Sequence, residues 1–350
     1  MLDNNQRNEI SKLGKFALIE KLSEKFRLTQ PSSILGIGSD SSVIRPTKGN
    51  IVTSSRLLVE NIHFDLTYFP LKHLGYKSVV VPLADILAMN AIPKQISLSI
   101  AVSNRFSMEA MQEIMDGIFV CCKKYSIDLV GLDISASQTG LIIAVNAFGD
   151  AEDDRIVKRD GAQEKELICV SGDFGAAYTG LILLEREKKV FEVNPDVQPN
   201  FNGYDYLLER QLKPEPPFDI INSLQKSEIM PTSMINVSDG IASALIHVCN
   251  ASHKGCTIYE NKIPIDTLTF NTLKEFKIVA TTVALNGGED YELLFTIKQD
   301  DFEKISQLKN ISVIGYIHEE TAGKNLITND ECLLPLKAQG FVENTDNTEK

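Results

Sequence analysis

The most constraining feature of this chain is a recurring pattern in which an acidic residue lies beside a glycine or at the end of a short apolar stretch. Apolar stretches of this length are typical of strands, and the turns after them place polar groups at strand ends. Carboxylates from distant segments that converge in a fold can hold Mg²⁺ against phosphate groups, because Mg²⁺ prefers hard oxygen ligands. The segments are GIGSD (36–40), VVPLAD (80–85), LVGLD (129–133), NVSD (236–239) and NGGEDYELLF (286–295).

Length and charge narrow the classes of protein to consider. A chain of 350 residues favours two domains, and contents of 43% hydrophobic and 23% charged residues indicate a globular protein with a buried core. The net charge of −12 argues against a nucleic-acid partner, which needs basic surface. An acidic protein that handles phosphates requires cations as intermediaries.

The sequence predicts a cytoplasmic protein without a membrane partner. The N-terminal segment MLDNNQRNEISKLG lacks the charge and apolar core of a signal peptide, and the most apolar stretch, 78–92, is interrupted by Pro82 and Asp85. The six cysteines form no CxxC motif and the five histidines do not cluster with them, so we expect reduced thiols and no zinc site.

Periodicity predicts a mixture of helices and strands, and therefore an α/β or α+β fold. We expect an N-terminal domain over 1–151, a C-terminal domain over 152–342 and a disordered tail over 343–350. The best-defined helix, 107–124, has Ser107 as its cap and a methionine-rich core stripe. The other expected helices are 11–27, 71–91 (with a kink at Pro82), 172–186 and one after Asp239, and the expected strands are 51–54, 95–102, 126–131, 141–148, 167–171, 291–297 and 312–317.

The segment GDFGAA (172–177) follows an expected strand and opens a helix, as phosphate-binding turns do. It matches neither GxGxxG nor GxxxxGK[ST], so we interpret it as a structural turn.

The order of the motifs resembles the thiamine-monophosphate kinase family, within the aminoimidazole ribonucleotide synthetase (PurM-like) superfamily, along almost the whole chain. The most specific segments are GGEDYEL and LVExxHF. The segments that carry the resemblance are GIGSDSSV, VTSSRLLVENIHF, LGYKSVVVPLADILAMNAIP, VGLD, SMINVSDGIASAL and LNGGEDYELLFT.

The resemblance implies a two-domain PurM-like α/β fold and a homodimer whose N-terminal strands form a β-barrel. It also implies direct transfer of the γ-phosphoryl group of ATP to thiamine monophosphate, with several Mg²⁺ ions and no covalent intermediate. No residue would act as a general acid or base, and catalysis would rest on positioning and charge neutralisation.

Site residues carry over from the family's motifs position by position. The implied metal ligands are Asp40, Ser54, Ser55, Asp85, Asp133 and Asp239; the implied ATP contacts are Arg159 and Ser238; and the implied substrate contacts are His63, Glu289 and Phe341.

Each residue also has an ordinary structural interpretation. An aspartate beside glycine is commonly a turn or cap residue, as Asp290 could be. His63 could be a buried, hydrogen-bonded side chain, Arg159 could form a surface ion pair, and Phe341 could belong to the core.

The chain departs from the family pattern at several metal-ligand positions. Arg56 and Asn236 stand where the family has aspartate, which raises the local charge by about 2 and about 1. Two like charges 4 Å apart repel by about 4 kcal/mol at an effective dielectric constant near 20, so a full set of Mg²⁺ ions beside Arg56 is unfavourable. Further differences occur at Ser39, Pro82 and Leu132.

These departures leave three functions open. One is a Mg²⁺- and ATP-dependent thiamine-phosphate kinase, impaired or with Arg56 contacting phosphate in place of one ion. Another is a catalytically inactive paralogue that binds nucleotide or thiamine phosphate. A third, a different superfamily enzyme such as a selenophosphate synthetase, needs an early reactive cysteine, and no cysteine precedes Cys121.

Overall fold

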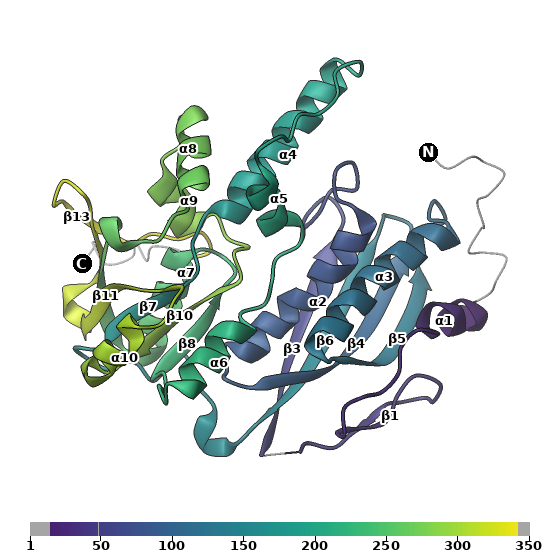
Figure 1. Ribbon diagram of the computed structural model, residues 1–350, viewed down its shortest axis with the longest axis horizontal. Coiled ribbons are helices and arrows are strands. Elements are labelled where there is room, and N and C mark those ends of the chain that lie inside the picture. Colours follow the sequence, from purple (N-terminus) through teal and green to yellow (C-terminus); the bar gives the residue numbers. More distant parts are fainter. Residues whose placement is uncertain (1–14, 48, 342–350) are drawn as a thin grey trace, which may run out of the picture. The chain divides into compact units, whose positions relative to one another are not determined.

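The computed structural model describes residues 15–47 and 49–341, which form two compact units (Figure 1). The first unit extends to Ile156 and also includes Leu181–Phe218, and the second contains Val157–Gly180 and the chain from Asp219 onward. The units are therefore discontinuous in sequence, whereas we expected continuous domains over 1–151 and 152–342. The expected tail, 343–350, and the segment used to exclude a signal peptide lie outside the described residues.

The first unit is built on a four-stranded sheet in the order β3-β6-β4-β5. Neighbouring strands are antiparallel except β4 and β5, which are parallel and are connected through helix α3. Helices α2 and α3 cover one face of this sheet (Figure 1). The bounds are β3 Asn50–Val59, α2 Leu71–Leu87, β4 Ile92–Val102, α3 Met108–Tyr125, β5 Asp128–Ala136 and β6 Ile142–Ala151.

The core of this unit follows the predicted periodicities. Alternate residues of β4 (Ile96, Leu98 and Ile100) are buried under the helices, as two-residue alternation requires. The α3 stripe is also buried, and the Ser107 hydroxyl accepts a hydrogen bond from the backbone N–H of Ala110. The predicted strand 95–102 and helix 107–124 are confirmed.

Two glycines let α2 and α3 pack closely. A Cβ atom on Gly75 would lie 2.0 Å from the carbonyl oxygen of Ile114, and one on Gly117 would lie 1.9 Å from that of Lys72. Because no real side chain fits at these distances, glycine at both positions sets the helix–helix spacing.

Smaller elements complete the first unit. The Leu18 and Leu22 side chains of α1 are buried in its core. The chain passes from one unit to the other after Ile156, inside α4 and at the start of α6. The bounds are α1 Lys15–Ser23, β1 Ser33–Leu35, β2 Val43–Ile44, α4 Ala176–Val193, α5 Asp205–Leu212 and α6 Phe218–Lys226.

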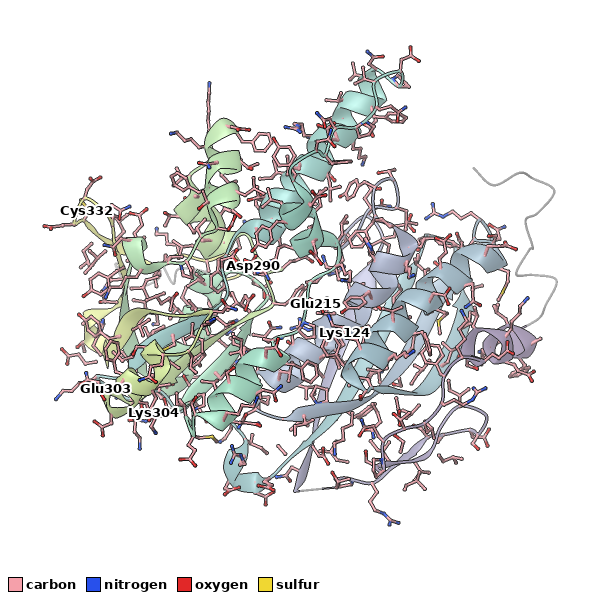
Figure 2. The ribbon with its side chains drawn as sticks, viewed as in Figure 1. Lys124, Glu215, Asp290, Glu303, Lys304 and Cys332 are labelled. Atoms are coloured by element: carbon pink, nitrogen blue, oxygen red, sulfur yellow. The ribbon has the colours of Figure 1, made fainter. Side chains whose placement is uncertain are left out.

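Glu215 holds the segment after α5 against the first unit. Its carboxylate accepts hydrogen bonds from the hydroxyls of Tyr76 (2.6 Å) and Tyr125, and it pairs with Lys124 at 2.8 Å and Lys213 at 3.3 Å. Lys124 and Glu215 are labelled in Figure 2. Burial alone would raise the pKa of Glu215, but hydrogen bonds from Lys124 and the two tyrosines keep it below its usual value.

Glu215→Gln is expected to destabilise the protein by about 1–2 kcal/mol at pH 7, because the amide cannot pair with both ammonium groups. A carboxyl group whose pKa is lowered on folding stabilises the protein above its unfolded pKa of about 4.3, and this contribution disappears as pH falls through the folded value. Urea unfolding at pH 7 and at pH 3 checks both statements. Glu113→Gln, at an exposed position of α3, is the control; a variant effect equal at both pH values would contradict the role of the charge.

The second unit contains a seven-stranded sheet in the order β13-β12-β9-β11-β7-β10-β8. Its strands are antiparallel except for the parallel pair β9 and β12. Helix α7 contributes most of the buried helical residues of its core. The bounds are β7 Leu167–Ser171, β8 Ser233–Val237, α7 Ile241–Ser252, β9 Lys254–Tyr259, α8 Thr267–Glu275, α9 Ala280–Asn286, β10 Glu292–Ile297, α10 Phe302–Ser306, β11 Ile311–Glu319, β12 Lys324–Ile327 and β13 Leu333–Pro335.

The predicted mixed α/β class is confirmed. The four-stranded sheet of this single chain does not close into a barrel within residues 15–47 and 49–341. Among the same residues, no helix is both long and apolar enough to cross a membrane.

Candidate functional site

Strand pairing brings two of the sequence motifs together in the second unit. In the antiparallel pair of β8 and β10, Val237 at the end of β8 lies opposite Glu292 at the start of β10. The turn after β8 and the loop before β10 therefore lie at the same end of these strands. The backbone N–H of Glu289 donates to the Ser238 carbonyl oxygen at 2.8 Å, and that of Tyr291 donates to the Val237 carbonyl oxygen at 3.2 Å. The predicted site residues Ser238, Asp239 and Glu289 therefore lie close together.

This turn and loop require unusual backbone angles. Gly240 has φ +89°, and a Cβ atom on it would lie 2.3 Å from the Leu285 carbonyl oxygen. Gly288 has φ +76°, and a Cβ atom on it would lie 2.7 Å from the Ser238 carbonyl oxygen. Glu289 (φ +61°) and Tyr291 (φ +53°) adopt left-handed angles although they are not glycines. Such conformations persist where the surrounding structure enforces them, which is common at functional sites.

Asp290 has a structural role. It is 1% exposed, and its carboxylate accepts hydrogen bonds from the backbone N–H groups of Gly175 (3.0 Å) and Ala177 (3.3 Å) at the start of α4. Figure 2 labels this side chain. These two backbone N–H groups belong to the GDFGAA segment and already donate to Asp290, so they are not available to a phosphate. The structural interpretation of that segment is therefore favoured over a phosphate-binding one.

His247, which belongs to no sequence motif, interacts with several of the predicted site residues. Its ring contacts Phe341 edge-on, with the ring centroids 4.9 Å apart. Burial lowers the pKa of His247, the positive charge of Arg159 lowers it further, and Asp239 acts in the opposite direction. Three predicted site residues, Arg159, Asp239 and Phe341, thus interact with one side chain of α7.

In the first unit, a groove of about 1040 Å³ runs between α1, the GIGSDSS loop and strands β4 and β5. Asp40 lines it together with Ser39, Ser41 and Ser42, and Asp133 lines it from β5. The Asp133 carboxylate pairs with Lys15 Nζ at 2.6 Å, which holds its pKa below the usual value. Two of the predicted metal ligands therefore line one groove.

The Asp85 carboxylate has partners of its own, on strand β3. Arg56 grips it with two hydrogen bonds, Nε to Oδ2 at 2.6 Å and Nη2 to Oδ1 at 2.7 Å. The Ser54 hydroxyl also donates to Oδ2, at 2.7 Å. Ser55 points to the opposite face of β3, where its hydroxyl bonds to the Asn146 side chain at 2.5 Å.

Two further positions were singled out from the sequence. His63 is exposed in the turn after β3, and its Nδ1 accepts a hydrogen bond from the backbone N–H of Val59 at 3.1 Å. Asn236 is 7% exposed on β8, so the family's aspartate is replaced here by a neutral buried side chain. The substrate contact assigned to His63 remains a prediction from the family pattern.

The donor groups do not assemble a complete Mg²⁺ site within either unit. Across residues 15–47 and 49–341, no three His, Cys, Asp or Glu side chains come together in a way that could hold a metal ion. At Asp85 a guanidinium group already occupies both carboxylate oxygens. Mg²⁺ therefore does not fit the arrangement at Asp85, while Asp40, Asp133 and Asp239 remain predicted ligands.

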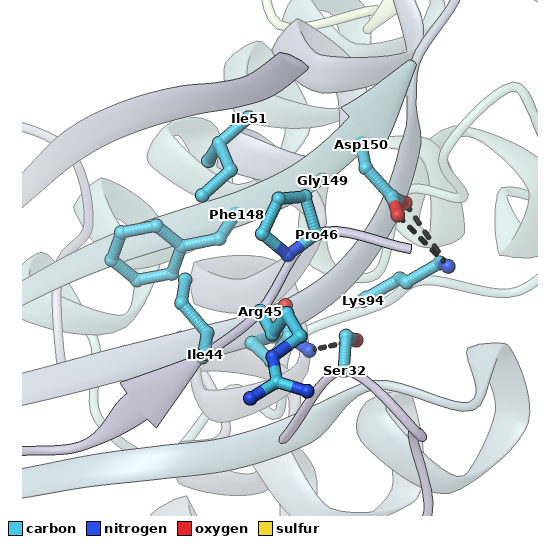
Figure 3. A pocket seen from close by; sticks show the side chains of 10 residues that line it. Ser32, Ile44, Arg45, Pro46, Ile51, Lys94, Phe148, Gly149 and Asp150 are labelled. Atoms are coloured by element: carbon cyan, nitrogen blue, oxygen red, sulfur yellow. Dashed lines mark hydrogen bonds and ion pairs between the residues drawn. The ribbon is translucent and has the colours of Figure 1, made fainter. Parts of the chain in front are cut away.

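A second, smaller crevice is visible in Figure 3, where Lys94 and Asp150 form an ion pair at 3.0 Å beside Pro46 and Phe148. Its volume of about 10 Å³ suits one water molecule at most. Hydrogen bonds from Thr47 and Lys94 hold the pKa of Asp150 below its usual value against the effect of burial. The crevice is a structural feature and not a ligand site.

The fold and the motifs define the class of protein. Residues 38–151 match the family description "AIR synthase related protein, N-terminal domain". The chain aligns with the crystal structure of thiamine-monophosphate kinase from Stenotrophomonas maltophilia K279a with a TM-score of 0.74 and 26% identity, covering 91% of this chain and 98% of that one. It also aligns with AaThiL complexed with AMPPCP and TMP, with a TM-score of 0.71 and 25% identity over 93% and 96% of the two chains.

Sequence similarity identifies the family. The thiamine-monophosphate kinase of Buchnera aphidicola subsp. Acyrthosiphon pisum is 32% identical over 336 residues, 94% of this chain and 98% of that protein. The chain belongs to the thiamine-monophosphate kinase family and is an enzyme of the phosphotransferase class.

Gly240→Ala is expected to destabilise the second unit by roughly 3–5 kcal/mol, since the new methyl group adds overlap with the Leu285 carbonyl to backbone strain. Gly323→Ala is the matched control: its φ of +81° is similar, but the nearest atom to its Cβ position is 3.5 Å away. The free energy of unfolding of that variant should fall by only about 1–3 kcal/mol. Thermal and urea unfolding measure both, and equal losses would show that the close approach of turn and loop does not matter.

Proposed function

We propose that this protein transfers the γ-phosphoryl group of ATP to thiamine monophosphate, giving ADP and thiamine diphosphate. A phosphate oxygen of thiamine monophosphate forms the new bond to the γ-phosphorus. The bond from that phosphorus to the β–γ bridging oxygen breaks, and its electron pair leaves with ADP. This reaction requires in-line positioning and neutralisation of oxygen charge more than covalent chemistry by the protein.

The observation that carries this proposal is similarity over nearly the whole chain to proteins named thiamine-monophosphate kinase and to AaThiL, whose structure is complexed with AMPPCP and TMP. In this proposal Arg159 and Ser238 contact ATP, and the Arg159 guanidinium grips phosphate oxygens. His63, Glu289 and Phe341 contact thiamine monophosphate, where an aromatic face suits a cationic ring. The His247 ring supports Phe341 through their edge-on contact.

Mg²⁺ enters this proposal with ATP, as the metal–nucleotide complex. Asp40, Asp133 and Asp239 are the proposed carboxylate contacts, because each offers oxygen ligands of the kind that Mg²⁺ prefers. Its chemical contribution is to neutralise charge on the phosphate oxygens.

The direct test is an assay of ADP and thiamine diphosphate formation from ATP and thiamine monophosphate with excess Mg²⁺. Stoichiometric appearance of both products supports the proposal. Hydrolysis of ATP without thiamine diphosphate, or no turnover above a blank, contradicts it.

Asp239→Asn is expected to lower kcat/KM by roughly 100-fold, because it removes a charge proposed to act on the cation beside the phosphates. The amide preserves the shape of the side chain, so the unfolding temperature should change little. Asp301→Asn, an aspartate of the same unit that pairs with Lys304, is the control and should keep its activity. Steady-state kinetics of both variants decide the matter, and an unaltered kcat/KM in Asp239→Asn would remove this residue from the site.

We also propose that the protein is a homodimer in which the four-stranded sheets of two copies pair. The face of this sheet opposite α2 and α3 carries exposed side chains, and Leu57 on its edge strand β3 is 53% exposed. Edge strands and exposed apolar side chains are suited to association with another copy.

Leu57→Glu is expected to shift the protein from a mass near twice 38.8 kDa to the monomer mass, because it places a charge in the proposed interface. Sedimentation equilibrium measures this change. Phe302→Glu, at a residue of the second unit that is 50% exposed, should leave the mass unchanged. A monomeric wild-type protein, or a variant that stays dimeric, would exclude this interface.

The Arg56–Asp85 pair favours one alternative, a paralogue that binds nucleotide or thiamine phosphate without turnover. Calorimetric titration distinguishes the two functions. Binding of ATP or thiamine monophosphate in the absence of product formation would support the alternative. Restoration of kinase activity in the double variant Arg56→Asp, Asn236→Asp would show that Arg56 and Asn236 caused the loss of turnover.

A further inference from the structure

The charge of the Asp85 side chain is neutralised by a cationic side chain of the protein, Arg56. Asp85 belongs to the last turn of α2, between the fully buried residues Ala84 and Ile86, and its side chain is 21% exposed. Facing it on β3 are Arg56 and Ser54, which strand alternation directs to the same face as buried Leu58. The Asp85, Arg56 and Ser54 side chains all belong to the first unit.

A carboxylate in this place needs a nearby cation. The C-terminal end of a helix carries a partial negative charge, which disfavours a second negative charge in the last turn. Because the residues on either side of Asp85 are buried, water compensates this charge only in part. The requirement can be met by a metal ion or by a cationic side chain.

The geometry at Asp85 suits a guanidinium group. The two Arg56 hydrogen bonds, 2.6 Å and 2.7 Å long, end on different carboxylate oxygens, which is the side-by-side arrangement in which arginine matches a carboxylate. The Ser54 hydroxyl adds a third hydrogen bond on Oδ2. A Mg²⁺ ion needs near-octahedral oxygen ligands at about 2.0–2.1 Å, so binding at Asp85 would first have to displace these donors.

We infer that Arg56 is the permanent cation at Asp85 and that Asp85 binds no divalent metal ion in this protein. The side chain of Arg56 is 37% exposed, so its charge can also be reached by an anionic ligand. If the proposed function holds, a phosphate oxygen at this position meets a guanidinium group where the family pattern would place an ion. The inference about the cation itself does not depend on turnover.

Binding of Mn²⁺, followed by electron paramagnetic resonance on the full chain without ATP or thiamine monophosphate, tests this inference. Asp85→Asn should bind the same number of Mn²⁺ ions as wild type, with dissociation constants within about twofold. Asp65→Asn is the matched control, because it also removes a carboxylate that is paired with a basic side chain of the first unit, in this case Lys188 at 2.6 Å. Loss of a Mn²⁺ site in Asp85→Asn but not in the control would overturn the inference.

The converse substitution tests whether the guanidinium occupies the place of an ion. Arg56→Asp should gain one Mn²⁺ site, and its unfolding temperature should fall in chelator and recover on addition of Mg²⁺. Arg56→Asn, a neutral variant, should gain a weaker site and serves if the aspartate variant fails to fold. If neither variant gains a site, Arg56 does not replace an ion and that part of the inference is wrong.

The outcomes separate this inference from the proposed function. Unchanged Mn²⁺ binding in Asp85→Asn, together with no thiamine diphosphate formation by the wild-type protein, would support the inference and contradict the proposed kinase activity. Loss of a Mn²⁺ site together with normal turnover would support the kinase and overturn the inference.

Discussion

The pairing of β10 with β7 on one side and β8 on the other is the constraint on which the second unit's candidate site depends. Leu294 lies opposite Val170 and Glu292 lies opposite Val237. The end of β7, the end of β8 and the start of β10 therefore lie next to one another, at the same end of the sheet. The SDG turn, the GGED loop and the start of α4 consequently reach one another. A one-residue slip of β10 would reverse its side chains and separate Asp290 from the helix that it caps.

Local patterns predicted much of this fold. The two-residue alternation of β4 and the capped, methionine-rich stripe of α3 are complete in the sequence, because each depends on near neighbours. The length of β3 was underestimated since polar residues over 53–56 interrupt its apolar pattern, although they fit a sheet with one open face. The placement of 181–218 with the first unit was not predictable, because Glu215 finds Tyr76 and Tyr125 at distant sequence positions.

The sequence singled out candidate site residues, but it did not indicate the interactions that these residues make in the fold. Motif order singled out Asp85 and flagged Arg56, but their ion pair depends on how α2 packs on β3. Alternation along a strand could have shown that the hydroxyls of Ser54 and Ser55 point to opposite faces. His247 had no local signal at all, since its relevance comes from Phe341, which lies far along the chain.

A cationic side chain and a bound metal ion solve the same electrostatic problem in different ways. A Mg²⁺ ion exchanges with solvent, so the charge that it supplies depends on ion concentration and on the number of oxygen ligands. Arginine remains protonated over the physiological range and carries directional donors. With Arg56 on β3 and Asp85 on α2, the charge at this position becomes part of the contact between sheet and helix. The charge at this position is therefore set by the packing of the first unit, and chelation cannot remove it.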